Sequence, residues 1–339
     1  MITATRQTLL VMTFCALGSW NATSAQDAPA TILQIELDNV VSYVYDTSDL
    51  TAYATVPTAI TLTPPTFAPW VSLGDIVAVN GKPVKGTFLE RTVILNLTPA
   101  PSPGQGVADI VRGNFVYRMV EIQQTDGTPI GSFILTGVNG GSAPPGAPAL
   151  FTSSNLAITG GTGAFLGARG QEGNGPPIPG ATLTTPRRAS VRENPANRRM
   201  NGGARLSIIL HVIPLSRPEI AAIPTGPAVF HADFSPVTTA KPAKAGEVLI
   251  VKATGLGPTA PGVDPGQPFP SDAIQQVNSP LNASVNGKPA EMINQIGWPG
   301  LVDTYRVDFR VPDGTASGIV GIQLTAAWVA GTSVNIPVQ

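Results

Sequence analysis

Apolar and polar residues alternate with a period of two along most of the chain, and the 3.6-residue period of an amphipathic helix is nearly absent. Alternation at period two is typical of strands that bury one face. Turn-forming pairs, among them Asn80-Gly81, Asp126-Gly127 and Asn286-Gly287, separate the alternating runs. Strands are expected at residues 31–37, 86–97, 110–123, 131–138, 155–158, 204–213, 247–253, 281–286, 304–311, 319–327 and 333–338. The pattern predicts an all-β protein.

The composition supports this prediction. The chain has 339 residues, of which 36 are Gly and 34 are Pro, well above the share of about one eighth in average proteins. Apolar residues make up 42% and charged residues only 12%, so the chain has enough apolar surface to fold and little self-repulsion. The 20 Lys and Arg balance the 21 Asp and Glu. This balance argues against binding to nucleic acid or to an anionic membrane through bulk charge.

The first 25 residues differ from the rest of the chain. They carry a positive charge at Arg6, an apolar stretch over residues 9–17 and a segment of mostly small residues ending at Ala25. This order is typical of a secretory signal peptide and predicts a secreted protein, extracellular or periplasmic. The apolar stretch is shorter than the roughly 20 residues of a membrane anchor, and no other transmembrane segment is expected. Because the single cysteine, Cys15, lies here, the mature chain is expected to have no disulfide and no cysteine-based metal site.

A glycine-rich motif lies in the middle of the chain. It consists of the turn signature Gly160, Gly161, Thr162, Gly163 and Phe165, followed by Gly167, Arg169 and Gly170. A dinucleotide-binding loop would need a glycine where Leu166 stands, and a helix cannot follow because glycines and prolines come next. We therefore expect a tight turn with positive φ at its glycines, Phe165 in a core, and no nucleotide or other cofactor.

The same motif resembles the signature of the dirigent and allene oxide cyclase superfamily, and the hairpin expected before it has the same order. The resemblance covers about residues 30–217. It implies an eight-stranded antiparallel barrel, often trimeric, that holds a small lipophilic molecule. In plant relatives the cavity binds a fatty-acid epoxide or orients phenoxy radicals. Ala164 stands where lignan-forming members can carry an acidic residue, which argues against radical coupling.

The C-terminal part resembles another module. Segments such as Lys244-Ala245-Gly246-Glu247 and Asn286-Gly287-Lys288-Pro289 are similar to immunoglobulin-like domains of the transcription-factor-immunoglobulin (TIG) type in secreted bacterial proteins. The resemblance implies a β-sandwich and says little about its ligand. Our hypothesis is that the sandwich attaches the protein to a surface, a polysaccharide or a partner. The expected organisation is a signal peptide at 1–25, a barrel at 26–216 with an irregular insertion at about 170–200, a linker at 217–226 and a sandwich at 227–339.

Candidate ligand-binding residues lie on the strand expected at 110–123. One face carries Phe115, Tyr117, Met119 and Glu121, and we expect it to form an apolar cavity wall with a phenol and a carboxylate near its end. Alternatively, these side chains fill a closed core with nothing bound. Glu36 is a second candidate cavity carboxylate, although an exposed strand face is the simpler interpretation.

Arginines form two further candidates. Arg169 could bind a carboxylate or stabilise an oxyanion from inside the barrel, or form a structural ion pair with Glu121 or Glu36. A basic segment could bind acidic polysaccharide or phosphate, although a solvated loop or a subunit contact is favoured because no aromatic residues interleave it. It contains Arg187, Arg188, Arg192, Arg198, Arg199 and Arg205.

Two function classes remain. We favour a secreted binding or scaffold protein, whose barrel holds a lipophilic ligand or mediates oligomerisation, because no complete catalytic constellation or metal site is recognisable. The alternative is a cyclase- or isomerase-like barrel enzyme in which Arg169, Tyr117 and Glu121 stabilise charge. Trp298 and Trp328 form either a carbohydrate-stacking platform or part of a core.

Overall fold

The computed structural model describes residues 31–44, 67–96, 112–139, 156–190, 192–213 and 216–339. The predicted signal peptide lies outside these residues. The described chain is all-β apart from one short 3-10 turn, η2 (Pro195–Asn197), and one four-residue helix, α1 (Arg198–Asn201). The alternation at period two is therefore a reliable guide to the fold class.

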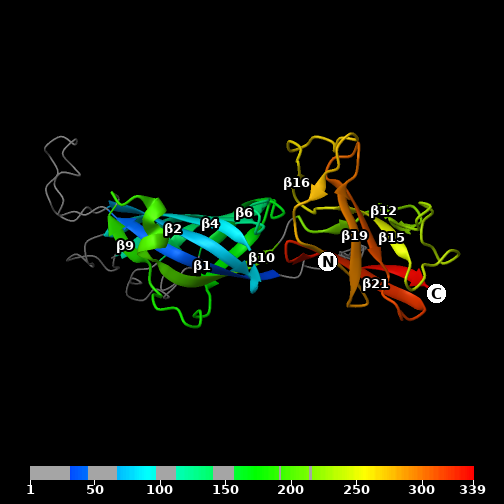
Figure 1. The fold of residues 1–339 in the computed structure, drawn as a ribbon, viewed down its shortest axis with the longest axis horizontal. Coiled ribbons are helices and arrows are strands. Elements are labelled where there is room, and N and C mark those ends of the chain that lie inside the picture. Colours follow the sequence, from blue (N-terminus) through cyan, green and yellow to red (C-terminus); the bar gives the residue numbers. More distant parts are fainter. Residues whose placement is uncertain (1–30, 45–66, 97–111, 140–155, 191, 214–215) are drawn as a thin grey trace, which may run out of the picture.

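Eight antiparallel strands form a closed barrel in the N-terminal half (Figure 1). The ring closes because β1 pairs with β10 on one side and with β2 on the other. In order around the barrel the strands are β1 (Thr31–Val44), β2 (Phe67–Val79), β4 (Lys85–Asn96), β5 (Arg112–Gln123), β6 (Pro129–Asn139), β7 (Ala157–Gly163), β8 (Arg169–Asn174) and β10 (Ala204–Ile213). Two short strands, β3 (Lys82–Pro83) and β9 (Arg187–Ser190), pair with the ends of β2 and β1 and are not counted among the eight. The predicted eight-stranded antiparallel barrel is confirmed.

A bulge in β1 changes which side chains face the barrel interior. Leu33, Ile35 and Leu37 point inward before the bulge, where Asn39 has a φ of 53°. Beyond it, Val41 and Tyr43 point outward and pack against Ala189 of β9. The segment between β8 and β10 thus covers the outside of β1. Since β8 itself belongs to the barrel, the expected insertion at 170–200 begins only after Asn174.

The second half of the described chain forms one nearly closed, barrel-like sheet. Two separate stacked sheets are not seen in residues 216–339, because β18 pairs with both β19 and β21 and so joins the strands on either side. The strands of this barrel-like sheet are β11 (Glu219–Ile220), β14 (Val229–Phe230), β15 (Val248–Thr254), β16 (Thr259–Ala260), β17 (Gln276–Val277), β18 (Leu281–Val285), β19 (Lys288–Gly297), β20 (Thr304–Arg310), β21 (Gly318–Ala326), β22 (Val329–Ala330) and β23 (Val334–Val338). A separate two-stranded ribbon consists of β12 (Ala222–Ile223) and β13 (Gly226–Pro227). The segment expected as a linker at 217–226 contains β11 and β12, and β11 pairs with β15.

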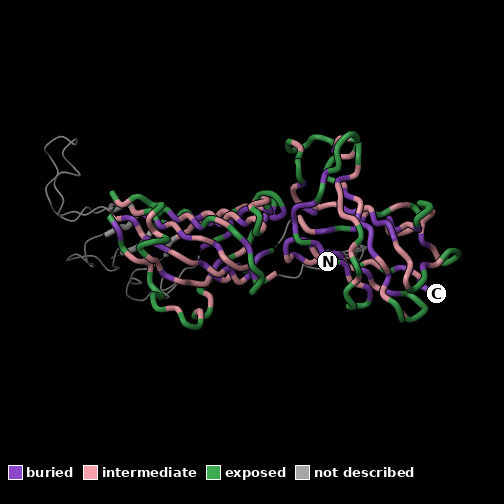
Figure 2. The backbone as a smooth tube through the Cα atoms, viewed as in Figure 1, coloured by how far each residue is buried: buried purple, intermediate pink, exposed green. Residues whose placement is uncertain are grey.

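The second sheet closes one end of the barrel. Ala327 and Val329 belong to the same buried cluster as the barrel interior, and Trp328 packs against it. The tight turn that carries Ala327 and Trp328 places both residues at positive φ, 47° and 64°. We call the barrel half at this end the proximal half and the other the distal half. Figure 2 shows buried residues along the barrel strands and at the junction with the second sheet.

Candidate ligand-binding site

Three charged side chains lie inside the distal half of the barrel. The inward face of β4 carries Phe88, Glu90 and Thr92, and the inward face of β5 carries Arg118 between Val116 and Val120. Glu90 lies directly opposite Arg118 in the register of these two strands. Glu172 on β8 reaches Arg118 from another part of the barrel wall. We call Glu90, Arg118 and Glu172 the buried ion cluster.

The cluster is held by several directed contacts. Arg118 Nε donates a hydrogen bond of 2.9 Å to Glu90 Oε2, and its Nη2 contacts the same carboxylate. Nη1 of Arg118 binds Glu172 Oε1. Thr92 Oγ1 donates to Glu90 Oε1 at 3.0 Å, and the guanidinium lies 5.0 Å from the centroid of the Phe88 ring. The arginine is thus fixed in orientation on both sides.

The pKa values of Arg118 and Glu172 are shifted by burial and by the opposite charges of the cluster. Burial alone would lower the pKa of Arg118, but Glu172 and Glu90 outweigh it and hold that pKa above its ordinary value. Burial raises the pKa of Glu172, and Arg118 only partly offsets the effect. Glu172 Oε2 is buried with no hydrogen-bond partner among the described residues. The surroundings of Glu172 therefore favour its protonated form.

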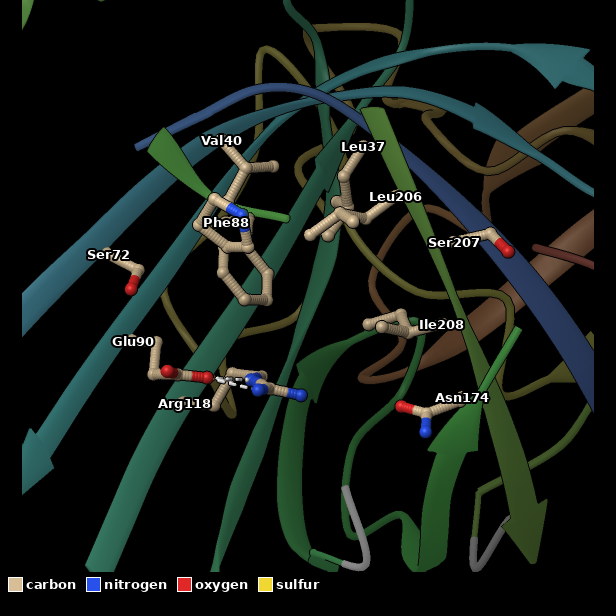
Figure 3. Close-up of a pocket in the computed structure, with 11 residues that line it drawn as sticks. Leu37, Val40, Ser72, Phe88, Glu90, Arg118, Asn174, Leu206, Ser207 and Ile208 are labelled. Atoms are coloured by element: carbon tan, nitrogen blue, oxygen red, sulfur yellow. Dashed lines mark hydrogen bonds and ion pairs between the residues drawn. The ribbon is translucent and has the colours of Figure 1, made fainter. Parts of the chain in front are cut away.

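A cavity of about 210 Å³ lies beside the cluster. Figure 3 shows Glu90 and Arg118 on one side of this space, with aliphatic side chains such as Leu37, Leu206 and Ile208 around it. Its lining is mainly apolar with a few polar groups, which is the usual make-up of a small-molecule site. The lining residues are Leu37, Val40, Ser72, Phe88, Glu90, Arg118, Asn174, Pro186, Leu206, Ser207 and Ile208.

The predicted cavity wall on β5 is wrong, because the strand has the opposite orientation. Phe115 and Tyr117 are 50% and 43% exposed on the outside of the barrel, while Arg118 is 5% exposed inside it. A charged side chain is costly to bury alone, which by itself would favour the outside of the barrel for Arg118. Two carboxylates from other strands offset that cost here.

The other predicted site residues also lie outside the cavity. Met119 and Glu121 share the outward face with Tyr117, and Gln123 Nε2 donates to Glu121 Oε1 at 3.2 Å. Glu36 alternates with the buried Leu37 and so lies on the outer face of β1. Arg169 is exposed, and its Nη1 donates to the backbone carbonyl of Ala168 at 2.9 Å. The hydrogen bonds and ion pairs of the described residues do not join Arg169 to Glu36 or Glu121.

The glycine-rich motif forms a junction between the two sheets. Phe165 is 2% exposed and stacks on Phe133 with ring centroids 4.1 Å apart. Gly163 has a φ of 62°, and a Cβ on Gly257 of the second sheet would lie 2.8 Å from Ala164 Cα. This close approach accounts for glycine at position 257. Gly160, Gly161 and Thr162 lie on β7 and lead into this turn.

The described residues contain no group of three or more His, Cys, Asp or Glu side chains arranged to hold a metal ion. In the same residues, no helix has the length and apolar character needed to cross a bilayer. Trp298 contacts Phe234, whereas Trp328 packs at the barrel end, so the two tryptophans do not form one platform.

The chain was compared with protein-family models, curated proteins and solved structures, and no match was found.

Proposed function

We propose that this protein binds a small, largely apolar molecule in the distal half of its barrel. The cavity beside the buried ion cluster is the observation that carries this proposal. An apolar cavity of about 150 Å³ can hold benzene, whereas drug-sized ligands occupy about 300 Å³ or more. A volume of about 210 Å³ suits a ligand of roughly eight to ten non-hydrogen atoms, such as one ring with a short substituent.

The ion cluster favours a neutral ligand that accepts hydrogen bonds. A guanidinium has five N–H donors, and three donor contacts of Arg118 go to Glu90 and Glu172. Two N–H groups remain for a carbonyl or hydroxyl oxygen. An anion would be repelled by the carboxylate of Glu90, and a cation would find Arg118 at the same place. We therefore propose a ketone, lactone or similar uncharged group as the polar end of the ligand.

We also propose the wider setting that the sequence suggests. The N-terminal segment supports export, and the antiparallel barrel supports the resemblance to the dirigent and allene oxide cyclase superfamily. An immunoglobulin-like second domain remains a proposal based on its sequence motifs. The exposed Phe115 and Tyr117 favour a role for the barrel exterior in oligomerisation, as the trimers of that superfamily suggest.

A second candidate function rests on Glu172. A buried carboxyl with a raised pKa beside an arginine is a common arrangement of a general acid. This observation supports a cyclase- or isomerase-like enzyme in which Glu90 and Arg118 line the cavity and Glu172 acts through its contact with Arg118. In that case the residues proposed to stabilise charge are Glu90, Arg118 and Glu172. They take the place of the residues predicted from the sequence, which were Arg169, Tyr117 and Glu121.

Filling the cavity tests the binding function. We expect acetophenone to bind the full chain and to lose at least about tenfold in affinity in Leu206→Trp, because the larger side chain occupies the space. Ile32→Trp on the outer face of the same barrel is the control and should bind as the parent does. Isothermal titration calorimetry measures both. Equal affinity of the parent and Leu206→Trp would contradict binding at this place.

A further inference from the structure

A second group of side chains points to a ligand outside the barrel. In the described residues, Tyr43 Oη, Arg198 Nε and Arg205 Nε are buried without a hydrogen-bond partner. All three atoms can donate a hydrogen, and a buried donor without an acceptor destabilises the fold. Tyr43 and Arg198 lie in the same part of the protein, and two such donors together indicate a missing acceptor.

Two of these donors, Tyr43 Oη and Arg198 Nε, lie close together on the outside of β1. Tyr43 faces Ala189 in the parallel pairing of β1 with β9, and α1 packs against β1. Arg198 on α1 reaches back to Asp75 of β2. The segment between β8 and β10 thus carries its arginines back to the strand that holds Tyr43.

The nearby carboxylates already have partners. Arg187 Nη2 lies 2.7 Å from Glu193 Oε1, and Nη1 of the same guanidinium donates to Oε2 at 3.0 Å. Arg199 Nη2 donates to Asp75 Oδ1 at 2.8 Å. Burial works against ionisation of Asp75, but hydrogen bonds from Arg199 and Asn39 lower its pKa below the ordinary value.

The charge of this surface stays positive. Beside Tyr43, three guanidinium groups, of Arg187, Arg198 and Arg199, pair with two carboxylates, of Asp75 and Glu193. Burial raises the pKa of Tyr43 and Glu193 adds to the effect, while Arg198 and Arg187 oppose it. The phenol of Tyr43 therefore remains protonated at neutral pH and can donate to an acceptor.

We propose that Tyr43, Arg187, Arg198 and Arg199 form an oxyanion site, which takes a carboxylate, sulfate or phosphate group. Planar guanidinium groups bind such anions through paired N–H donors, and the Tyr43 hydroxyl supplies a neutral donor beside them. The anion can be free in solution or part of an acidic polysaccharide. The site lies on the outer face of β1 and is independent of the ligand proposed for the barrel interior.

Two probes separate the possible sources of the anion. Inorganic phosphate and polygalacturonate are each titrated into the full chain at low ionic strength, where screening is weak. Binding of phosphate supports a site for small anions, and binding of the polymer alone supports recognition of an acidic polysaccharide. If neither probe binds, the proposal is overturned.

Three variants test the residues. Tyr43→Phe removes only the hydroxyl and keeps the apolar ring, and Arg199→Gln removes a charge from a side chain that is 66% exposed. We expect each to weaken binding of the effective probe roughly tenfold, as for the loss of one charge-assisted hydrogen bond. Arg169→Gln, an exposed arginine elsewhere on the barrel, should leave affinity unchanged. Equal effects of Arg199→Gln and Arg169→Gln would show nonspecific attraction and overturn the site.

Discussion

The proximal and distal halves of the barrel are built from the same strands but differ in what fills their interior. The proximal half is packed with apolar side chains and is closed by Ala327 and Val329 of the second sheet. The distal half contains the buried ion cluster and the cavity. A polar cluster beside an empty space is costly for stability, whereas a packed apolar end stabilises the fold. From this difference we infer that the proximal half stabilises the fold and that the distal half binds the ligand.

The largest expected effect comes from removing the charge at the centre of the distal half. Arg118→Met leaves Glu90 and Glu172 buried without their cation, and we expect a loss of about 4 kcal/mol in the free energy of unfolding. Urea denaturation measures it. The combined variant Glu90→Gln, Arg118→Met and Glu172→Gln should recover most of this loss, since no charge remains uncompensated. A loss below about 1 kcal/mol in the single variant would contradict a tightly coupled cluster.

A smaller effect is expected at the proximal end. Trp328→Ala removes a partly buried side chain that packs on the barrel core, and we expect a loss of about 2 kcal/mol without a change in acetophenone affinity. Leu166→Ala is the control, because Leu166 is 62% exposed at the glycine-rich turn. If Trp328→Ala weakened acetophenone binding tenfold, the two halves would not have separate roles.

The pH dependence of stability distinguishes the two halves through Glu172. Its folded pKa is raised above the ordinary value of 4.5, so the folded protein holds this proton to a higher pH than the unfolded chain does. The stabilising contribution is complete below about pH 4.5 and is lost as pH rises through the folded pKa, by up to about 1.4 kcal/mol per pH unit. Glu172→Gln should lack this slope. Parallel stability curves for the parent and the variant would contradict a retained proton.

The smallest effect is expected on the outer face of β5. Tyr117→Ser changes a side chain that is 43% exposed, so the free energy of unfolding should change by no more than about 0.5 kcal/mol. Acetophenone affinity should also stay the same. A clear loss of affinity would restore Tyr117 to the ligand site that the sequence predicted.

Local patterns predicted much of the fold. The expected strands at 86–97 and 110–123 agree closely with β4 and β5, because alternation at period two is a property of each strand alone. β2 was missed, since Pro69, Gly74 and Asp75 interrupt its apolar pattern. The glycine-rich turn was predictable because positive φ at Gly163 depends on local sterics.

The site could not be predicted in the same way. The orientation of β5 depends on Glu90 and Glu172, which belong to other strands and meet Arg118 only when the barrel closes. One signal was present in the sequence, because Val116, Val120 and Ile122 share the face of Arg118 and would bury it. On this strand, a charged residue flanked by β-branched residues on its own face marked the buried ion pair, whereas the aromatic face did not mark the cavity.

The most direct test of the account is to map acetophenone on the methyl groups of the full chain by NMR. If the distal half binds the ligand, chemical shifts will change for Leu37, Val40, Leu206 and Ile208, which line the cavity. Methyl groups of the proximal core, such as those of Val79, Ile122 and Val212, will not change. Changes confined to the proximal core or to the outer surface would contradict a binding site in the distal half.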